Sequence, residues 1–497
     1  MRILFVYPKY PKTFWSFYYV LKFLRKKASL PPLGLLTVAA MLPNEWEKRL
    51  VDANVRDLTD EDIAWADMVF IGAMIVQQED ARDVIARAHA QGKKVVAGGP
   101  LFTSQSEQFQ DVDHLILGEV ENILPIFVQD IIAGKAKDRY SSQERPDITK
   151  TPIPLWKLIK MRDYVTMPVQ YSRGCPFDCE FCDIVILNGR IPRTKTAQQL
   201  INEMEALYRA GWRGSVFIVD DNFIGNKVKL KKVLPYLIEW QKQHKYPFSL
   251  FTEASVNLAS DTELLQMMME ANFYKVFLGI ETPSVESLNE CGKYQNTTID
   301  LAEAVRIIQR YGMQVMGGFI VGFDNDTESV FEAQIRFIQQ VGIVTAMVGM
   351  LNALPGTRLW HRLNREGRLQ QVTSGENTDG SINFIPIMGE TNLKEGYKKI
   401  LETIYSPKKY YERISILIKN YNPTAKGRLT KTDLYAFFRS TWRIGVFSRA
   451  RFLYWKLLAK TLIFKKKALP MAIELAIIGR HFELVAQRIV KSKGPVL

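Results

Sequence analysis

The chain is 497 residues long with a net charge of +14, and 47% of its residues are hydrophobic and 24% charged, which predicts a globular protein of two or three domains. The charge is uneven: residues 407–467 hold 16 lysines and arginines against two acidic residues, an excess as large as that of the whole chain. No stretch reaches the roughly 18 uncharged apolar residues of a membrane span, and the short apolar start with only four cysteines indicates the reducing cytosol rather than secretion.

Residues 1–140 alternate short apolar runs with helical patterns. The predicted strands are Ile3–Tyr7, Arg49–Asp52, Met68–Ala73, Lys94–Ala97 and His114–Leu117, and the clearest helices are Pro32–Leu42, Glu79–Gln91 and Asn122–Ala133. Continuous apolar strands with helical crossovers predict a Rossmann-like, doubly wound parallel sheet.

Ligands of such sheets bind beyond the carboxyl ends of the strands. Gly98, Gly99, Gly118 and Glu119 fall there, and the glycines allow a ligand to approach the backbone closely. No G-x-G-x-x-G motif follows the first strand, which disfavours a dinucleotide. The pattern alone leaves two interpretations open, a ligand-binding or docking domain and glycines that serve tight turns.

A polar segment follows, and Thr151-Pro152-Ile153-Pro154 indicates a boundary, because residues before proline avoid the helical region. We place a linker at residues 141–160 and a second strand–helix domain at 161–370. Its strands are predicted at Val165–Tyr171, Ser215–Val219, Phe248–Phe251, Lys275–Gly279, Val315–Val321 and Ala346–Leu351, and its helices at Ala197–Ala210, Lys229–Gln243, Asp261–Glu270, Ile299–Tyr311 and Glu328–Val341. Six such units predict a partial (β/α)6 barrel, whose reactive groups gather at the carboxyl ends of the strands.

Three of the four cysteines, Cys175, Cys179 and Cys182, follow the first of these strands with C-x3-C-x2-C spacing. Iron–sulfur clusters are held by cysteine thiolates, usually four, so three ligands leave one iron open to a small molecule. A zinc site normally needs a second ligand pair, and a disulfide would leave one cysteine unpaired. The spacing therefore favours a cluster.

Polar or glycine elements follow the other strands of the barrel. Such a strand-end acid is often only a helix cap or a solvated loop residue, but here they recur beside one metal site. The candidate cofactor-binding residues are Phe181, Asp220, Asp221, Glu253, Glu281, Gly318 and Gly322. The fourth cysteine, Cys291, lies in a later loop; we expect an incidental cysteine, with a second catalytic thiol or an extra cluster ligand as the alternatives.

The cysteine motif, with Phe181 before its last cysteine, resembles that of the radical S-adenosylmethionine (SAM) superfamily. Gly279-Ile280-Glu281-Thr282 and Gly318-Phe319-Ile320-Val321-Gly322 resemble its fourth- and fifth-strand motifs. The N-terminal sheet joined to such a barrel resembles the cobalamin-binding branch. The Pro31-Pro32-Leu33-Gly34-Leu35 helix start and the basic C-terminal extension look most like the hopanoid C-2 methylase group.

The resemblance implies a [4Fe-4S] cluster held by the three cysteines, with SAM bound at the open iron through its amino and carboxylate groups. It also implies a 5′-deoxyadenosyl radical, methyl transfer by way of cobalamin, and a flavodoxin- or ferredoxin-type electron donor. Two departures stand out. Pro8–Phe17 lacks the D-x-H-x-x-G histidine ligand of cobalt, and Asp220-Asp221-Asn222 replaces the usual glycine-glycine-glutamate, which leaves open the acid that meets the SAM amino group.

Residues 371–497 are predicted to be helical, at Leu393–Tyr405, Lys408–Asn420, Lys431–Trp442, Arg449–Leu462 and Pro470–Val490. Aromatic residues alternate with arginines between Phe437 and Lys467, which suits an anionic membrane surface, a nucleic acid, or a helical bundle with a solvated basic face. The resemblance to lipid-modifying enzymes favours peripheral contact with the inner face of the membrane over nucleic acid.

The leading hypothesis is therefore a cobalamin-dependent radical SAM methyltransferase acting on an unactivated carbon of a hydrophobic, isoprenoid or hopanoid-like substrate. A second hypothesis keeps the radical step but couples, cyclises or oxidises a lipid or tetrapyrrole without methyl transfer. A third, of another class, is an RNA-binding or RNA-modifying protein that uses the basic extension.

Overall fold

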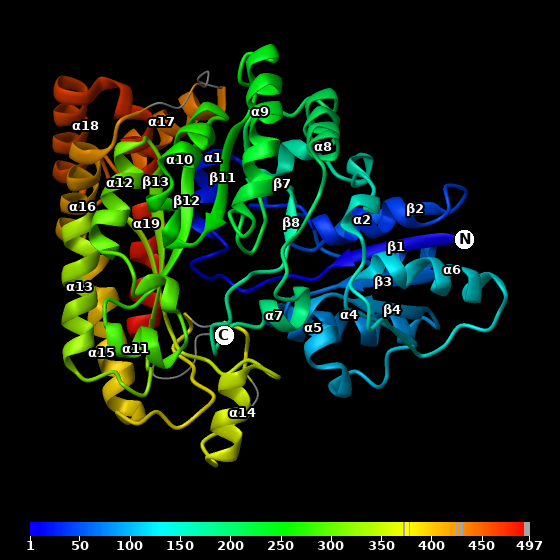
Figure 1. The fold of residues 1–497 in the computed structure, drawn as a ribbon. Helices are drawn as coiled ribbons and strands as arrows, with labels where there is room; N and C mark the ends of the chain where they lie inside the picture. The colour runs from blue at the N-terminus through cyan, green and yellow to red at the C-terminus, as the bar shows by residue number, and fades with distance from the viewer. Residues whose placement is uncertain (371–372, 377, 424–425, 427–430, 492–497) are drawn as a thin grey trace.

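The computed structural model describes residues 1–497 except 371–372, 377, 424–425, 427–430 and 492–497. Short parts of the predicted helical region, including its C-terminal end, thus lie outside the described residues. In Figure 1 the N-terminal sheet, in blue and cyan, lies on one side and the C-terminal helices, in orange and red, lie on the other. The strands of the second sheet, in green, lie nearer the C-terminal helices.

The N-terminal sheet has six parallel strands in the order β2-β1-β3-β4-β5-β6. Its strands are β1 (Arg2–Tyr7), β2 (Glu47–Asp52), β3 (Met68–Gly72), β4 (Lys94–Gly98), β5 (His114–Leu117) and β6 (Arg139–Ser141). The helices of this part of the chain are α1 (Tyr18–Leu24), α2 (Leu33–Met41), α3 (Asp60–Trp65), α4 (Gln78–Ala90), α5 (Pro100–Ser104) and α6 (Leu124–Ile132). The sequence pattern does not predict β6, because its three residues are polar or aromatic and lie in a charged stretch.

Alternate residues of the central strands point to opposite faces of this sheet. Leu4 and Val6 of β1 belong to one buried apolar cluster, and Ile3 and Phe5 belong to another. Two cores, one on each face, are what a sheet covered by helices on both sides requires. The doubly wound part of the predicted fold class is confirmed.

The second sheet also has six parallel strands, and their spatial order follows the chain from β7 to β14. The strands are β7 (Met167–Val169), β10 (Ser215–Ile218), β11 (Ser249–Ala254), β12 (Phe273–Glu281), β13 (Gln314–Val321) and β14 (Thr345–Met350). The helices between and after them are α7 (Ile184–Asn188), α8 (Ala197–Arg209), α9 (Lys227–Gln243), α10 (Thr262–Glu270), α11 (Val285–Glu290), α12 (Leu301–Arg310), α13 (Ser329–Val341) and α14 (Arg358–Arg365). Consecutive parallel strands with helical crossovers form the predicted part-barrel.

The C-terminal region is helical, as predicted, and forms one continuous apolar core with the barrel. Its helices are α15 (Glu390–Ile404), α16 (Pro407–Asn420), α17 (Lys431–Arg443), α18 (Arg451–Lys465) and α19 (Leu469–Lys491). The segment after β1 also joins this core, because the Phe14 ring lies 5.4 Å from that of Phe482 and the Phe14 carbonyl lies 3.1 Å from His481 Nε2. None of the helices in the described ranges has the length and apolar character that crossing a bilayer requires.

Candidate active site

The three neighbouring cysteines lie in the loop between the short strand β8 (Ser172–Arg173) and α7. Gly174 enters this loop with φ +96°, and a Cβ there would lie 2.7 Å from the Gly189 carbonyl oxygen. Only glycine fits such a left-handed, crowded position. The loop is closed by Cys182, whose backbone N–H donates to the Cys179 carbonyl at 3.1 Å.

The three thiols are half-buried, and two of them have amide neighbours. Asn222 Nδ2 lies 3.8 Å from Cys175 Sγ, and Gln295 Nε2 lies 3.8 Å from Cys179 Sγ. Burial raises the pKa of the Cys175 and Cys179 thiols, and the positive charge of Lys293 acts in the opposite direction. Amide donors and a nearby cation suit thiolates that carry the negative charge of an iron–sulfur cluster.

In the described part of the chain, no three histidine, cysteine or acidic side chains converge on a single metal ion. A four-iron cluster does not need such convergence, because each thiolate binds a different iron. Cys179 interacts electrostatically with both Cys175 and Cys182, so the three sulfurs share one neighbourhood. The donor set therefore fits the predicted cluster.

Lys293 lies beside this loop and forms a buried ion pair with Glu281. Glu281 has a left-handed backbone, φ +61°, at an irregularity in the pairing of β12 with β13. Gly279 makes room for the pair, since a Cβ there would lie 2.5 Å from Glu281 Oε1 and 2.6 Å from Lys293 Nζ. The structure thus places the predicted Glu281 near the cysteine thiols with its charge already paired.

Asp220 and Asp221, which follow β10, support the backbone that leads into the cysteine loop. Asp220 accepts hydrogen bonds from the backbone N–H groups of Tyr171 and Ser172, both at 2.7 Å, and from the Ser172 hydroxyl at 2.6 Å. Burial nonetheless raises the pKa of Asp220 to about 7. Asp221 accepts from the Gly174 N–H at 3.3 Å and from Asn188 Nδ2 at 3.0 Å. Both carboxyl groups are used in positioning the loop.

Glu253 on β11 differs from these two acids, because its side chain lines a cavity. Burial, with the negative charges of Asp221 and Asp220, raises the pKa of Glu253 to about 8. Of the predicted acids that follow the barrel strands, Glu253 is the one that lines the cavity in the described part of the chain.

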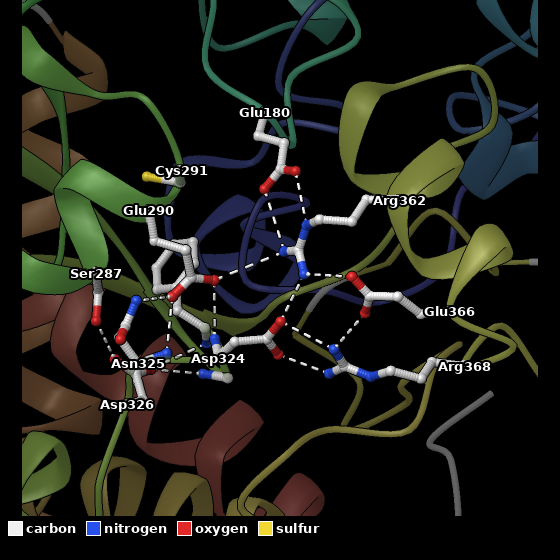
Figure 2. Close-up of polar contacts among 12 residues, drawn as sticks. Glu180, Ser287, Glu290, Cys291, Asp324, Asn325, Asp326, Arg362, Glu366 and Arg368 are labelled. Carbon is white, nitrogen blue, oxygen red and sulfur yellow. Dashed lines mark hydrogen bonds and ion pairs between the residues drawn. The ribbon is translucent and has the colours of Figure 1, made fainter.

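An ion-pair network fixes the far side of the cysteine loop (Figure 2). Glu180, between Cys179 and Cys182, receives two bonds from the Arg362 guanidinium of α14, at 2.8 and 3.2 Å. Arg362 also donates to Asp324 at 2.6 Å, and Arg368 donates to both oxygens of Asp324. Two-pronged arginine–carboxylate pairs fix orientation as well as distance, so α14 and the loop after β13 hold the cysteine loop in place.

The structure shows how the remaining predicted residues near the loop are packed. The Phe181 ring lies 6.2 Å from the Phe323 ring. A Cβ on Gly318 would lie 2.8 Å from the Phe277 ring, so glycine makes room for that ring, and Gly322 has φ +108°. The buried Cys291 thiol bonds the Leu288 carbonyl at 3.5 Å, and the Cys291 carbonyl accepts from the Glu180 N–H at 2.8 Å. Cys291 thus contacts the cysteine loop through its backbone.

The predicted Glu119, beyond β5, is bound by three arginines. Its carboxylate oxygens lie 2.9 Å from Arg173, 2.7 Å from Arg193 and 3.5 Å from Arg145. Arg173 also pairs with Glu121 at 2.7 Å. Because Arg173 and Arg193 come from β8 and β9 (Arg193–Thr194), this cluster ties the edge of the N-terminal sheet to the strands that flank the cysteine loop.

The three predicted glycines of the N-terminal sheet line one large cavity. A Cβ at Gly99 would lie 3.1 Å from the Ala73 carbonyl, and one at Gly98 would lie 3.0 Å from the Ile116 carbonyl. Gly118, with φ +87°, has nothing within 4 Å of where its Cβ would be. Gly98 and Gly99 thus let neighbouring backbone pack closely, while Gly118 faces open space. This end of the sheet, which we call the glycine cradle, lines the cavity and fits an extended ligand such as cobalamin.

The cavity measures about 2210 Å³ and runs from this cradle into the lumen of the part-barrel. Typical ligand pockets measure roughly 300–1,000 Å³, so it can hold more than one large molecule. The lumen is largely apolar, with lining from Phe217, Phe251, Phe277, Met316 and Met347. Among the described histidines, only His244 lines the cavity, and its ring nitrogens already face the Trp240 carbonyl at 2.9 Å and Glu205 at 3.3 Å.

Sequence reasoning did not find Lys293, Arg362 or the arginines around Glu119. Lys293 follows Cys291 by two residues, and that proximity is its one local signal. Arg362 lies 182 residues from Glu180, and nothing near it in the sequence indicates the contact.

Models of three protein families match successive parts of the chain. A model of the B12 binding domain matches residues 25–128, one of the radical SAM superfamily matches 169–338, and one of a domain of unknown function, DUF4070, matches 357–494. The chain is 46% identical over 462 residues to an uncharacterised methyltransferase, sll1242, of Synechocystis sp., which covers 92% of this chain and 86% of that protein. It is 36% identical over 476 residues to hopanoid C-2 methylase of Rhodopseudomonas palustris, covering 93% and 89%.

Solved structures share the fold at low sequence identity. The cobalamin-dependent SAM radical enzyme OxsB, with aqua-cobalamin and SAM bound, matches with a TM-score of 0.64 at 14% identity, over 99% of this chain and 80% of OxsB. The radical SAM methyltransferase TsrM of Kitasatospora setae, with cobalamin and a [4Fe-4S] cluster bound, matches with a TM-score of 0.59 at 13% identity, over 96% and 99%.

Proposed function

Because this chain belongs to the cobalamin-binding radical SAM family, in the group that includes hopanoid C-2 methylase, we propose that it methylates an unactivated carbon of a hydrophobic, polycyclic isoprenoid. The family sets the reaction class, that of a cobalamin-dependent radical SAM C-methyltransferase, and its cofactors, a [4Fe-4S] cluster, SAM and cobalamin. When bound, these cofactors supply a carbon-centred radical and a methyl group. The protein's own residues bind them, align them and exclude water.

We assign the cluster to Cys175, Cys179 and Cys182. Asn222 and Gln295 place amide N–H groups toward two of the sulfurs, and hydrogen bonds to sulfur tune a cluster's reduction potential. Glu253 is the candidate for contact with a SAM polar group, since its carboxyl faces the cavity. Gly98, Gly99 and Gly118 would hold cobalamin, and the loop after β1, residues 8–17, contains no histidine that could bind its metal.

The observation that carries the substrate class is the composition of the lumen. Three phenylalanines and two methionines line it, and the rings of Phe217 and Phe251 stack at 4.6 Å with an angle of 1° between their planes. Flat, apolar walls favour a rigid hydrocarbon skeleton, because burial of apolar area stabilises its binding by about 25 cal/mol per Å².

The proposal is tested by anaerobic reconstitution with iron, sulfide and cobalamin, followed by addition of SAM, a low-potential reductant such as dithionite, and a hopanoid-containing lipid extract. We expect 5′-deoxyadenosine, S-adenosylhomocysteine and a lipid heavier by one methylene. The second candidate function, radical chemistry without methyl transfer, predicts 5′-deoxyadenosine without S-adenosylhomocysteine. If the Cys179→Ala variant still cleaves SAM, the cluster assignment is wrong.

Two further proposals concern partners. A flavodoxin- or ferredoxin-type protein supplies the electron, and the protein works in the cytoplasm, in peripheral contact with the inner face of the membrane. The basic C-terminal region supports the second, since cationic residues are attracted to anionic lipid headgroups.

A further inference from the structure

We infer that the barrel cavity opens onto a membrane-docking face formed by α17 and α18, so that a bilayer with anionic headgroups delivers the apolar substrate directly into the lumen. The inference rests on the proposed function in that the substrate is a lipid of the bilayer. It goes beyond that function in naming the surface, the mouth of the cavity and the source of the substrate.

The first observation is a concentration of exposed apolar side chains. Of the 24 large hydrophobic side chains that are exposed in the described residues, ten lie between residues 434 and 464. Eight of these are exposed by 58–80%: Leu434, Phe438, Trp442, Phe447, Phe452, Leu462, Ile463 and Phe464. Isolated exposed apolar residues are normal, but a contiguous cluster indicates a binding surface. We call residues 434–467 the docking face.

The second observation is the charge of the same face. Seven of its lysines and arginines are exposed, with no aspartate or glutamate between residues 434 and 467: Arg443, Arg449, Arg451, Lys456, Lys460, Lys466 and Lys467. Aromatic side chains that enter the headgroup region, surrounded by cations, are the pattern of proteins that lie on anionic membranes. Exposed rings distinguish this face from a merely solvated basic one, because a solvated face gains nothing from Phe452 being 74% exposed.

The third observation joins this face to the cavity. Leu434 is 58% exposed and also lines the cavity. Phe438 and Trp442 follow it at intervals of four residues, so the three side chains form one row along α17. Lys467 and Pro470, before and at the start of α19, are likewise exposed and line the cavity. The cavity therefore reaches the surface where the apolar row begins.

The fourth observation is a polar rim at this end of the lumen. Lys275, at the start of β12, forms an ion pair with Glu474 of α19. Gln314, at the start of β13, lines the cavity while 1% exposed, and its Oε1 has no hydrogen-bond partner. An apolar lumen behind a polar rim has the polarity of a lipid leaflet, so an amphiphile can enter with its hydrocarbon end first.

The docking face is tested by sedimentation with vesicles of phosphatidylglycerol or of phosphatidylcholine, using the reconstituted holoenzyme. The Arg443→Gln/Arg449→Gln/Arg451→Gln variant should bind phosphatidylglycerol vesicles roughly 100-fold more weakly, since each cation near an anionic leaflet contributes about fivefold. The matched control removes three exposed lysines of α9, at 229, 232 and 242, and should bind like the wild type. Equal loss in both variants, or equal binding to both vesicle types, overturns the docking face.

Insertion of the aromatic row has its own readout. Brominated lipids should quench the fluorescence of Trp442 and Trp455, which are 63% and 45% exposed, and the Trp442→Phe/Trp455→Phe variant should lose that quenching. The Phe438→Ser variant should bind more weakly, whereas Tyr236→Ser, an equally exposed aromatic on α9, should not. If brominated lipids quench the wild type and the Trp442→Phe/Trp455→Phe variant equally, the docking face does not point toward the bilayer.

Delivery from the bilayer is tested by offering diploptene, a pentacyclic hopene, in phosphatidylglycerol vesicles or in detergent micelles. The triple arginine variant should methylate the vesicle substrate at least tenfold more slowly than the wild type and the micellar substrate at a similar rate. A wild-type enzyme that is active in micelles and gains nothing from vesicles overturns delivery while the proposed function stands. If S-adenosylhomocysteine and methylated lipid form in neither, the proposed function itself fails.

Discussion

Replacement of Arg362 by glutamine should lower the free energy of unfolding, by an amount that follows from how deeply its ion pairs are buried. The Arg362 side chain is 24% exposed, and its partners Glu180 and Asp324 are 13% and 17% exposed. Removal of one partner from a fully buried ion pair costs about 3–5 kcal/mol. The residual exposure, and the bonds that Arg368 still makes to Asp324, reduce the expected loss to about 2–3 kcal/mol.

The loss is measured by urea unfolding of the anaerobically reconstituted protein, followed by tryptophan fluorescence, together with its iron and sulfide content. Arg365→Gln is the matched control on the same helix, because Arg365 is exposed and, among the described residues, bonds the His361 carbonyl alone, at 3.4 Å. It should cost less than about 0.5 kcal/mol. Arg362→Lys should restore part of the stability, since lysine keeps the charge but loses the fork of two donors. An Arg362→Gln protein with normal iron content and an unchanged urea midpoint refutes the reasoning.

Three other perturbations test the site. Gly174→Ala should abolish cluster incorporation, because its Cβ would meet a backbone oxygen at 2.7 Å, whereas Gly211→Ala, also at positive φ but with nothing within 4 Å, should cost only about 1 kcal/mol and keep full iron content; equal iron loss in both speaks against the loop geometry. Glu253 binds a proton more tightly in the folded protein, with a pKa of about 8 against an ordinary 4.5, so the ligand-free protein should lose stability as pH rises between those values. Glu253→Gln should remove up to about 1.4 kcal/mol of that loss per pH unit, and identical pH profiles in urea unfolding would contradict it. Glu119→Gln should weaken both iron retention and cobalamin binding, measured by absorbance after gel filtration, and normal values for both would remove Glu119 from any bridging role.

The elements that the sequence predicts well are those whose signal is local. The continuous apolar run of a strand such as β1 and the spacing of Cys175, Cys179 and Cys182 are visible within eight residues. Contacts between distant residues carry no such signal. Glu119 is expected from its strand-end position to meet a ligand, yet it meets arginines up to 74 residues away. The roles of the site residues, the three cysteines included, therefore stay predictions.

The lack of a local signal also explains why the sequence does not predict the contacts of Asp220 or the strand β6. A strand-end aspartate reads equally as a ligand contact or as a support for a neighbouring loop, and only the fold brings Ser172 within 2.6 Å of it. A three-residue edge strand is too short to show the two-residue period of a β-strand, so the sequence pattern does not predict β6. Local periodicity reports which face of an element is buried, but not which partner the fold brings to it.

The arginine cluster around Glu119 makes the two halves of the active site thermodynamically reciprocal. Glu119 lines the cavity beside the glycine cradle, while Arg173 and Arg193 flank the cysteine loop. A ligand that stabilises one arrangement of Glu119 also stabilises β8 and β9, the strands that carry its arginine partners. By linkage, incorporation of the iron–sulfur cluster between these strands strengthens binding of the ligand by the same free energy. We therefore expect cobalamin binding and cluster incorporation to favour each other by the same free energy, whichever cofactor is loaded first.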